Sequence, residues 1–395
     1  MEPNELRRKM MGLWKETFHD SEEYVNLIFN ACYDPALVEY ETAGNDLISA
    51  LMGIPYEFGG AEGRIRGLYL CGLATKNKFR GKGIMTRLLE RINRRAANLG
   101  FAFTFLIPSS ERLARWYASR GYVGAFHRCP LNYTSVHDFK LEYDNLLDQQ
   151  KGKVADLKRR LYETLKCQRV SDSTPEEELR QIKEMMIADQ NRQLDMEVYH
   201  DEKGIDTIIK ESLVSGAPIY YCVTPQGNVA AVAFMSPGTH SIIEAKRIYS
   251  SDLCSRYRLL EYVKSQHPDQ SVRVYVNPME SERRKLAETY GMAKILDLHE
   301  ILKFQASAHG DLKYSILVNG TENSEIVKYD IRSGKVISKT YDENSEEGKE
   351  LLSRMSTMSH RDISNVLFRR PDSGVLVAEA FGMPSLGGFI SLMLD

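Results

Sequence analysis

A basic, glycine-containing turn between an apolar strand and an amphipathic helix constrains the fold of this chain most. The stretch RIRGLYLCGLAT, residues 64–75, has the composition of a strand, and KNKFRGKGIMTRLLERI, residues 76–92, follows directly. After Gly83 the apolar side chains recur at helical spacing on one face, with arginines largely on the other. Gly81 and Gly83 permit backbone dihedrals that other residues rarely adopt. The pattern predicts a strand, a turn and a helix in immediate succession.

This turn has two interpretations. The first N–H groups of a helix lack internal partners, and the helix dipole adds about half a positive charge there, so the turn could hold a pyrophosphate. Lys78, Arg80 and Lys82 would add positive charge. The alternative is a basic surface turn, and this stretch alone leaves both open. The motif G-x-x-x-x-G-K-[ST] is absent and G-x-G is not completed as G-x-G-x-x-G, which excludes two familiar phosphate loops.

Helical and strand patterns alternate through the first 130 residues or so. We expect helices over residues 4–18, 20–32, 84–98 and 109–121, and strands over residues 37–43, 46–58, 64–75 and 101–107. Residues 122–134 are typical of a strand pair. From residue 139 to residue 208 the pattern is mostly helical and charged.

Part of this pattern returns later in the chain. SERLARWYASRGY, residues 110–122, is echoed by SERRKLAETYGM, residues 281–292; each is typical of a helix ending at a glycine and follows a strand. A degenerate duplication explains the echo, although any helix with such a glycine would look similar. The second copy has no counterpart of the turn at residues 80–83.

The last ninety residues or so predict an antiparallel sheet and two amphipathic helices. Turns are expected at Gly320 and at residues 333–334. The chain then ends in an apolar segment that closes with Asp395. We expect that segment to be tied into the fold.

Composition limits the class of protein. The 395 residues are 43% apolar and 27% charged, with a formal net charge of −2. This length predicts two or three domains, and the balanced charge argues against a nucleic-acid partner. No long apolar span or signal-peptide pattern is present, so we expect no membrane association and a cytoplasmic location. Six scattered cysteines without metal-ligand spacing predict reduced thiols and no metal site.

At this point the sequence resembles a known superfamily. LCGLATKNKFRGKGIMTRLLE is similar to motif A of the GCN5-related N-acetyltransferases (GNAT), and WYASRGY, residues 116–122, is similar to their motif B. Lys78 stands where the motif has glutamine or arginine. The resemblance implies that main-chain groups of one strand align the acetyl-CoA thioester and that the turn holds its pyrophosphate. The strand residues are Cys71, Gly72 and Leu73, and the turn residues are Phe79, Arg80, Gly81, Lys82, Gly83 and Ile84.

The layout of the whole chain resembles the acetyltransferases of the enhanced-intracellular-survival (Eis) type. That resemblance implies an α/β and α+β multidomain fold with two GNAT-like mixed-sheet domains, the second degenerate, and a C-terminal domain like sterol carrier protein 2 (SCP2). The expected domains are residues 1–130, 131–304 and 305–395. The resemblance also implies a homo-oligomer of six subunits.

The expected reaction is acetyl transfer from acetyl-CoA to a primary amine of a small cationic or lysine-like acceptor. An amine with a pKa of about 10 must lose a proton before it attacks, so the site needs a base, and the thiolate needs an acid. By resemblance Tyr117 is the acid; the alternative is packing against Trp116 and Phe103. By resemblance the base is the α-carboxylate of Asp395, although this chain ends in Asp rather than the expected aromatic residue. An α-carboxyl with a pKa of about 3.5 would need burial to serve as a base.

The acceptor site is less constrained. The acidic run at residues 20–24 with Phe18, Tyr33 and Tyr56 could bind a cationic amine, although helix capping and core packing explain these residues slightly better. Lys82, Arg87 and Arg91 are candidates for the 3′-phosphate of CoA, with a solvated surface position favoured for Arg91.

Two other functions stay open: a non-catalytic CoA or lipid binder, and an aminoacyl transferase with tandem GNAT domains. The latter predicts a basic groove in the second half, where charges of both signs are instead mixed evenly.

Overall fold

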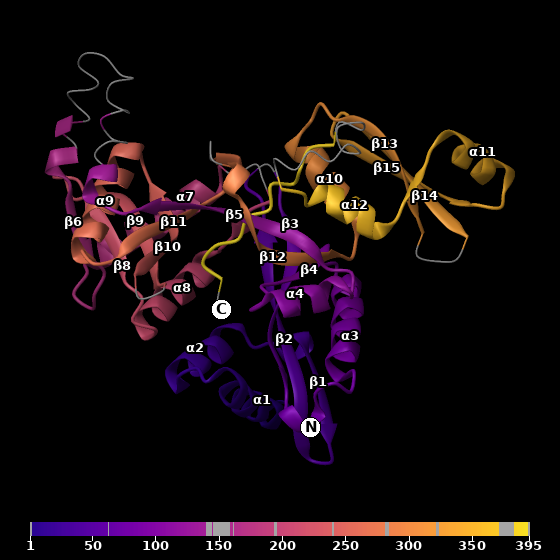
Figure 1. The fold of residues 1–395 in the computed structure, drawn as a ribbon, viewed down its shortest axis with the longest axis horizontal. Helices are drawn as coiled ribbons and strands as arrows, with labels where there is room; N and C mark the ends of the chain where they lie inside the picture. The colour runs from indigo at the N-terminus through magenta and orange to yellow at the C-terminus, as the bar shows by residue number, and fades with distance from the viewer. Residues whose placement is uncertain are drawn as a thin grey trace. The chain divides into compact units, whose positions relative to one another are not determined.

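The structure is a computed structural model, and its chain divides into two compact units (Figure 1). Unit 1 lies within Met1–Arg128, Gln193–Tyr199 and Glu282–Ile390, and unit 2 within Cys129–Arg192, His200–Ser281 and Ser391–Asp395. The described residues are 2–61, 63–139, 144, 159–160, 162–192, 196–238, 241–280, 284–320, 324–370 and 383–393. Among the described helices, none is both long enough and apolar enough to cross a membrane.

Unit 1 is built on a mixed sheet with the strand order β1-β2-β3-β4-β12-β5. Figure 1 shows α1 and α2 on one side of β1 and β2, and α3 on the other. The elements that build this sheet and its cover are α1 (Pro3–Phe18), α2 (Glu22–Cys32), a 3-10 turn (Pro35–Leu37), β1 (Val38–Ala43), β2 (Asp46–Phe58), β3 (Ile65–Thr75), a 3-10 turn (Asn77–Phe79), α3 (Ile84–Asn98), β4 (Phe103–Leu106), α4 (Glu111–Ala118), β5 (Val123–Tyr133), β7 (Val198–Tyr199), a 3-10 turn (Arg284–Leu286) and β12 (Glu288–Ile295).

Local sequence signals place the ends of these elements. The Ser21 hydroxyl accepts the Tyr24 N–H at the start of α2. Gly44 turns the chain between β1 and β2 with a φ of +61°, and Gly100 follows α3 with a φ of +75°. The helices and strands predicted for the first 121 residues are confirmed to within a few residues.

An apolar core lies between the sheet and the helices α3 and α4. Leu88 and Ile92 on α3 are fully buried in it. One polar network crosses this core, where Asn93 Oδ1 accepts from Thr104 Oγ1 at 2.7 Å and from Tyr122 Oη at 3.2 Å. Because each buried polar atom has a partner, the network adds no unsatisfied group to the core.

The C-terminal part of unit 1 is an α+β layer with the strand order β15-β14-β13-β16. Ser333 and Gly334, with φ of +49° and +74°, form the two-residue turn between β14 and β15. The predicted antiparallel sheet and its two helices are confirmed. The elements are α10 (Leu298–Ala308), β13 (Lys313–Asn319), β14 (Glu325–Arg332), β15 (Lys335–Asp342), α11 (Glu346–Arg354), β16 (Thr357–Met358) and α12 (His360–Leu367).

The described C-terminal segment, residues 383–393, is tied into the fold. In unit 1 the His127 N–H donates to the Gly388 carbonyl at 2.9 Å. In unit 2 the ring nitrogen Nε2 of His200 lies 3.0 Å from the Ser391 carbonyl oxygen. The expected anchoring of this segment is confirmed as far as residue 393.

Unit 2 repeats the element order that runs from α1 to β4. Two helices precede three antiparallel strands, then a helix and a strand parallel to the third strand. This order supports the predicted duplication. The elements of unit 2 are β6 (Lys166–Arg169), α7 (Glu176–Gln190), α8 (Glu202–Val214), β8 (Ile219–Val223), β9 (Val229–Pro237), β10 (Ile242–Ser250), α9 (Leu253–Gln266), β11 (Ser271–Val276) and a 3-10 turn (Pro278–Glu280).

The helix predicted over residues 281–292 is wrong. The described part of this stretch forms a 3-10 turn and then β12, which pairs antiparallel with β4 and β5. Gly291 belongs to the strand, where a Cβ would meet the Ile390 and Phe126 side chains at 2.9 Å and 3.1 Å. Long-range sheet pairing thus overrides a helical pattern and a supposed C-cap glycine.

Two further expectations differ from the structure. Residues 122–134 form one strand, β5, rather than a pair, because its first part pairs with β12 and its last part with β11. The stretch 139–208, expected to be mostly helical, contains the strands β6 and β7. Both strands are short and lie among helices, so no clear strand period marks them in the sequence.

Ion pairs with the buried carboxylate of Glu39 on β1 hold helix α3 against this strand. The Glu39 side chain is only 6% exposed and accepts from Arg91 Nε at 2.7 Å and from Arg95 Nη2 at 2.6 Å. The two arginine side chains stay 38% and 41% exposed. Arg91 therefore has a structural partner in this ion pair, and is not simply the solvated side chain that we expected.

We predict that Glu39→Ala destabilises unit 1 by about 2–3 kcal/mol. Removal of one member of a buried ion pair costs about 3–5 kcal/mol, and the partial exposure of both arginines lowers this. Thermal unfolding should show a Tm about 5 °C lower. Glu111→Ala, which removes an exposed pair with Arg115, is the control and should shift Tm by less than about 1 °C. Equal Tm values for the two variants would contradict this prediction.

Candidate active site

Strand β3 carries a bulge where it separates from β4. Between the cross-strand pairs Ala50–Ala74 and Met52–Cys71, β2 has one residue and β3 has two. The parallel pairing of β3 with β4 ends at Tyr69. The main-chain groups of residues 71–73 therefore face β4 without a ladder partner among the described strands.

Gly72 makes this bulge possible. Its φ is +61°, and a Cβ there would lie 2.4 Å from the Trp14 ring of α1. Trp14 is held in turn by a hydrogen bond from Nε1 to Asp20 Oδ2 at 2.7 Å. Sequence reasoning missed the role of Trp14 and Asp20, although a glycine inside a strand pattern is a signal for a bulge or a close approach.

The loop of residues 76–83 leads from β3 to α3. A 3-10 turn precedes Arg80, whose Nε donates to the Thr75 carbonyl at 2.9 Å. Gly81 and Gly83 follow with φ of +77° and +72°, and both are exposed. No side chain caps the start of α3 at Gly83. The first N–H groups of α3 are therefore open to an anion, and these residues fit a pyrophosphate.

Positive side chains surround this loop. Lys78 Nζ and Lys82 Nζ lie 5.4 Å and 5.1 Å from the centre of the Phe79 ring. Arg87 Nη1 donates to the Lys82 carbonyl at 3.3 Å. Arg91 instead binds Glu39, so the structure does not bring it to the loop with the other basic residues.

Tyr117 projects from α4 into the core of unit 1. It is 7% exposed, and its ring lies 5.0 Å from that of Trp116 and 5.8 Å from that of Tyr122. The expected contact with Phe103 is absent from the aromatic pairs of the described residues. Burial raises the pKa of the Tyr117 phenol well above its usual value. Its hydroxyl has no hydrogen-bond partner among the described residues.

Some of the predicted site residues contribute to the same apolar core. Leu73 from the bulge, Phe79 and Ile84 from the loop, and Tyr117 from α4 belong to a single apolar cluster. Asp395, the predicted base, lies outside the described residues. In the described part of the chain no group of three His, Cys, Asp or Glu side chains could hold a metal ion.

Unit 2 keeps the bulge but not the loop. β10 has one extra residue, Lys246, opposite β9, and only Ser251 and Asp252 separate β10 from α9. Asp252 caps α9: its Oδ1 accepts the Ser255 N–H at 3.0 Å, and its Oδ2 accepts the Ser255 hydroxyl at 2.8 Å. A carboxylate thus occupies the helix start where the first copy offers open N–H groups, and it repels a phosphate.

The candidate acceptor residues form one connected group apart from Tyr56, because Trp14 donates to Asp20 and packs against Phe29 with ring centres 5.7 Å apart. Phe18 packs against Trp14 with ring centres 5.3 Å apart. Tyr33 stacks on Phe29 at 5.7 Å. Tyr56 contacts Tyr69 and Phe105 in a separate cluster on the sheet. These side chains have structural partners, as the alternative interpretation predicted.

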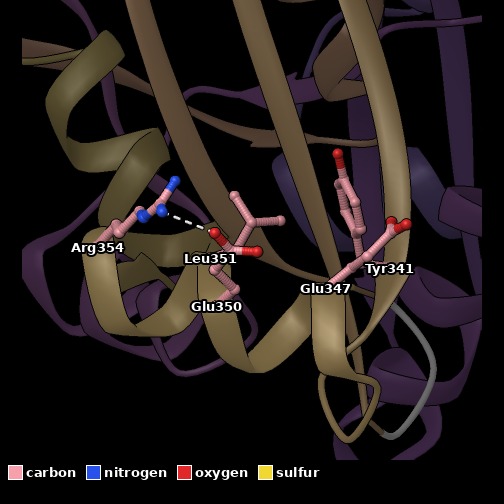
Figure 2. Close-up of a pocket in the computed structure, with 5 residues that line it drawn as sticks. All are labelled: Tyr341, Glu347, Glu350, Leu351 and Arg354. Atoms are coloured by element: carbon pink, nitrogen blue, oxygen red, sulfur yellow. Dashed lines mark ion pairs between the residues drawn. The ribbon is translucent and has the colours of Figure 1, made fainter.

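A different pocket lies in the C-terminal layer, between β15 and α11. Figure 2 shows its lining, and Arg354 Nη2 pairs there with Glu350 Oε1 at 2.6 Å. Its volume is about 190 Å³, and its lining residues are Tyr341, Glu347, Glu350, Leu351 and Arg354. Three of the five are charged, so the pocket does not suit an acyl chain.

Comparison with known proteins identifies the class of the N-terminal part. Residues 4–124 match the family model of the acetyltransferase (GNAT) domain. This part of the chain is therefore a GNAT acetyltransferase domain, as motif A and motif B predicted, and the protein is an acyltransferase. The GNAT fold implies the use of acetyl-CoA. No curated protein sequence matches the chain.

Solved structures share the fold over nearly the whole chain. A GCN5-related N-acetyltransferase from Kribbella flavida has a TM-score of 0.65 at 12% identity and covers 100% of this chain and 96% of its own. A conserved protein from Enterococcus faecalis V583, described as a probable N-acyltransferase, has a TM-score of 0.64 at 15% identity, with coverage of 94% and 95%. Eis1 from Mycobacterium abscessus has a TM-score of 0.60 at 10% identity, with coverage of 96% and 91%.

We predict that Gly81→Ala and Gly83→Ala each raise the Kd for acetyl-CoA about tenfold or more. An alanine at a φ near +75° is strained by about 1 kcal/mol, and its methyl group obstructs the approach of a phosphate to the N–H groups. Titration calorimetry with acetyl-CoA measures the effect. Gly216→Ala is the matched control, because Gly216 in unit 2 has a φ of +72° and open space around it. This variant should bind acetyl-CoA as the wild type does; the opposite ranking of Kd values would contradict the prediction.

Proposed function

We propose that this protein transfers the acetyl group of acetyl-CoA to a primary amine of a small cationic or lysine-like acceptor. One observation carries the proposal: Leu73 of the open strand edge, Ile84 at the uncapped start of α3 and Tyr117 of α4 pack in the same apolar core of unit 1. A strand edge, an anion site and a buried acid are the three parts that such a transfer requires.

The cofactor would be bound mainly by main-chain groups. The pantetheine arm contains two amides, which can pair with the open edge of β3 at Cys71, Gly72 and Leu73 as an added strand would. An N–H group of the same edge would polarise the thioester carbonyl. The pyrophosphate would lie at the loop of residues 79–84, held by the N–H groups of Gly81, Lys82, Gly83 and Ile84. The N–H groups of Phe79 and Arg80 instead donate to the Lys76 and Asn77 carbonyls within the 3-10 turn. Lys82 and Arg87 remain candidates for the 3′-phosphate.

Tyr117 would act as the general acid. The amine nitrogen attacks the carbonyl carbon, the carbon–sulfur bond breaks, and the departing thiolate takes the phenol proton. Because burial raises its pKa, the phenol is protonated at every physiological pH. Transfer of a proton from such a phenol to a thiolate is uphill, and the positive charge on the attacking nitrogen would offset part of this cost.

The base would be the α-carboxylate of Asp395. The amine must lose a proton near neutral pH, and the resemblance to Eis-type enzymes assigns this task to the chain end. The anchoring of residues 383–393 supports the proposal, since a base must be held in place. Burial of the carboxylate would have to raise its pKa from about 3.5.

The finer architecture is also part of the proposal. Unit 2 would be a degenerate GNAT-like domain, supported by its repeated topology and by the self-capped start of α9. The layer of α10, β13–β16, α11 and α12 would be the SCP2-like domain, with boundaries near residues 130 and 304. The sequence composition suggests a cytoplasmic protein. By resemblance it would assemble as a homo-oligomer of six chains, and light scattering would measure the number.

Two other functions are less well supported. A lipid carrier would need an apolar cavity, whereas the pocket of the C-terminal layer in Figure 2 is lined mainly by charged residues. An aminoacyl transferase would need a basic groove in the second half of the chain, where both signs are mixed. Release of free CoA thiol from acetyl-CoA, screened over polyamines and aminoglycosides, separates these functions. No release with any amine, despite acetyl-CoA binding, would leave the non-catalytic binder as the better proposal.

We predict that Tyr117→Phe lowers kcat about 10²-fold without a change in KM for acetyl-CoA. The ring packing is kept and only the proton donor is lost. Because the phenol stays protonated below about pH 10, the loss should be the same from pH 6 to pH 9. Tyr122→Phe is the matched control: its hydroxyl bonds Thr104 and Asn93, so it should cost about 1 kcal/mol of stability and little kcat. Wild-type kcat in Tyr117→Phe would rule out the acid.

We predict that two alanines added after Asp395 lower kcat by about 10²-fold or more and leave the Kd for acetyl-CoA unchanged. The added residues move the α-carboxylate away from the position that we propose for it. Steady-state kinetics and calorimetry on the same preparation separate the two effects. Asp395→Asn keeps the α-carboxylate and should retain activity. If the extended chain turns over at the wild-type rate, the base lies elsewhere.

A further inference from the structure

Two cysteines lie directly opposite each other on neighbouring strands of unit 2. β6 is the edge strand of its sheet and pairs antiparallel with β8. In this register Cys167 on β6 faces Cys222 on β8. Cys222 is fully buried, and Cys167 is half-buried at the sheet edge.

The register places these cysteines at a closely spaced pair. The Val170 N–H donates to the Ile219 carbonyl at 2.8 Å, so residues 170 and 219 form a hydrogen-bonded pair. Hydrogen-bonded and non-hydrogen-bonded pairs alternate along an antiparallel ladder. Cys167 and Cys222 lie three positions away and therefore form a non-hydrogen-bonded pair. Side chains approach most closely at such pairs, with Cα atoms about 4.5 Å apart, which lies within the range of disulfides.

Both thiols point to the face of the sheet that α9 covers. Cys167 Sγ lies 3.9 Å from the Arg258 carbonyl oxygen, and Cys222 Sγ lies 3.8 Å from the Ser255 carbonyl oxygen. Each thiol thus has a weak acceptor on the same helix, and both are free thiols in this structure. Helix α9 holds the two sulfur atoms side by side.

The two thiols differ in reactivity. A hydrogen bond with Cys222 lowers the pKa of Cys167, and the charge of Arg258 lowers it further. Burial and the charge of Glu261, which pairs with Arg258 at 3.1 Å, raise this pKa and oppose both effects. The pKa of Cys222 is raised by the same pair interaction and by burial. The thiolate is the reactive form of cysteine. Cys167, which is also the more accessible of the two, would react first.

We propose that Cys167 and Cys222 are a redox-active pair that a peroxide converts to a reversible cross-strand disulfide. The Cys167 thiol first loses its proton to solvent. The thiolate then attacks one peroxide oxygen, the O–O bond breaks, and a sulfenic acid and hydroxide form; the hydroxide takes up the lost proton and becomes water. The Cys222 sulfur then attacks the sulfenic sulfur, the S–S bond forms, and a second water leaves with the Cys222 proton. In sum, two thiols and one hydrogen peroxide give one disulfide and two waters. A dithiol reductant reverses the change by thiol–disulfide exchange.

The disulfide would link the edge strand β6 covalently to β8. It closes a loop from residue 167 to residue 222 that contains α7 and α8. A cross-link across a loop of this length restricts the unfolded chain and raises stability. We expect the Tm of unit 2 to rise by about 5 °C on oxidation and to return on reduction.

The test treats the full chain with stoichiometric hydrogen peroxide, blocks free thiols by alkylation, and maps peptides by mass spectrometry without reduction. We expect a cross-linked peptide pair containing Cys167 and Cys222, absent after treatment with dithiothreitol. Cys222→Ser should give Cys167 sulfenic acid without a cross-link and without the rise in Tm. Cys32→Ser, which removes another half-buried thiol, should leave the cross-link unchanged.

Three results would overturn the proposal. They are over-oxidation of Cys167 to the sulfinic acid with Cys222 still reduced, a cross-link of either residue to another cysteine, and a cross-link between chains only. If Cys222→Ser does not fold, the variant Cys167→Ser replaces it, because the half-buried position tolerates serine better. This variant should show neither the cross-link nor the rise in Tm. The acetyl transfer proposed for unit 1 is not a readout here, so failure of one proposal leaves the other unaffected.

Discussion

The divergence of β3 from β4 is the constraint on which the first unit depends. Parallel pairing ends at Tyr69, and the bulge at Gly72 then turns main-chain groups away from the ladder. Unpaired main-chain groups are costly unless solvent or a ligand satisfies them. The Trp14 ring fixes the bulge from α1, so the open edge is part of the packed fold. A ligand with its own amides would satisfy such an edge, as we propose for the cofactor of this domain.

Sequence reasoning succeeded where local contacts decide the structure. The turn glycines Gly81 and Gly83, the cap at Ser21 and the helical spacing of α3 each reflect contacts within a few residues. The cofactor loop and the catalytic candidate Tyr117 could therefore be predicted as parts. Their meeting in one apolar cluster followed only from the resemblance to motif A and motif B, since it depends on packing between distant segments.

The errors fall where long-range pairing decides the outcome. β12 occupies a place between β4 and β5, although a helical pattern leads into it. β5 pairs with β12 over its first part and with β11 over its last. No pattern within residues 281–292 reports which distant strand will pair with them. Trp14 was missed as a site residue for the same reason, because its partner Gly72 lies far along the chain. Helix propensity differs by only a few tenths of a kcal/mol among such residues, which several ladder hydrogen bonds outweigh.

The two copies share one topology but differ at the start of the helix that follows the third strand. Both carry a bulge on the third strand and a helix that follows it. In the first copy the helix starts at Gly83 without a side-chain cap, and in the second it starts at Asp252, whose carboxylate satisfies the N–H of Ser255. The carboxylate already satisfies an N–H group of its own helix, whereas the glycine start of α3 leaves the first N–H groups to water or to an anion. A glycine in place of a capping side chain costs only about a few tenths of a kcal/mol. The first copy therefore keeps an anion site open at little cost in stability, and the second copy fills the same place with its own carboxylate.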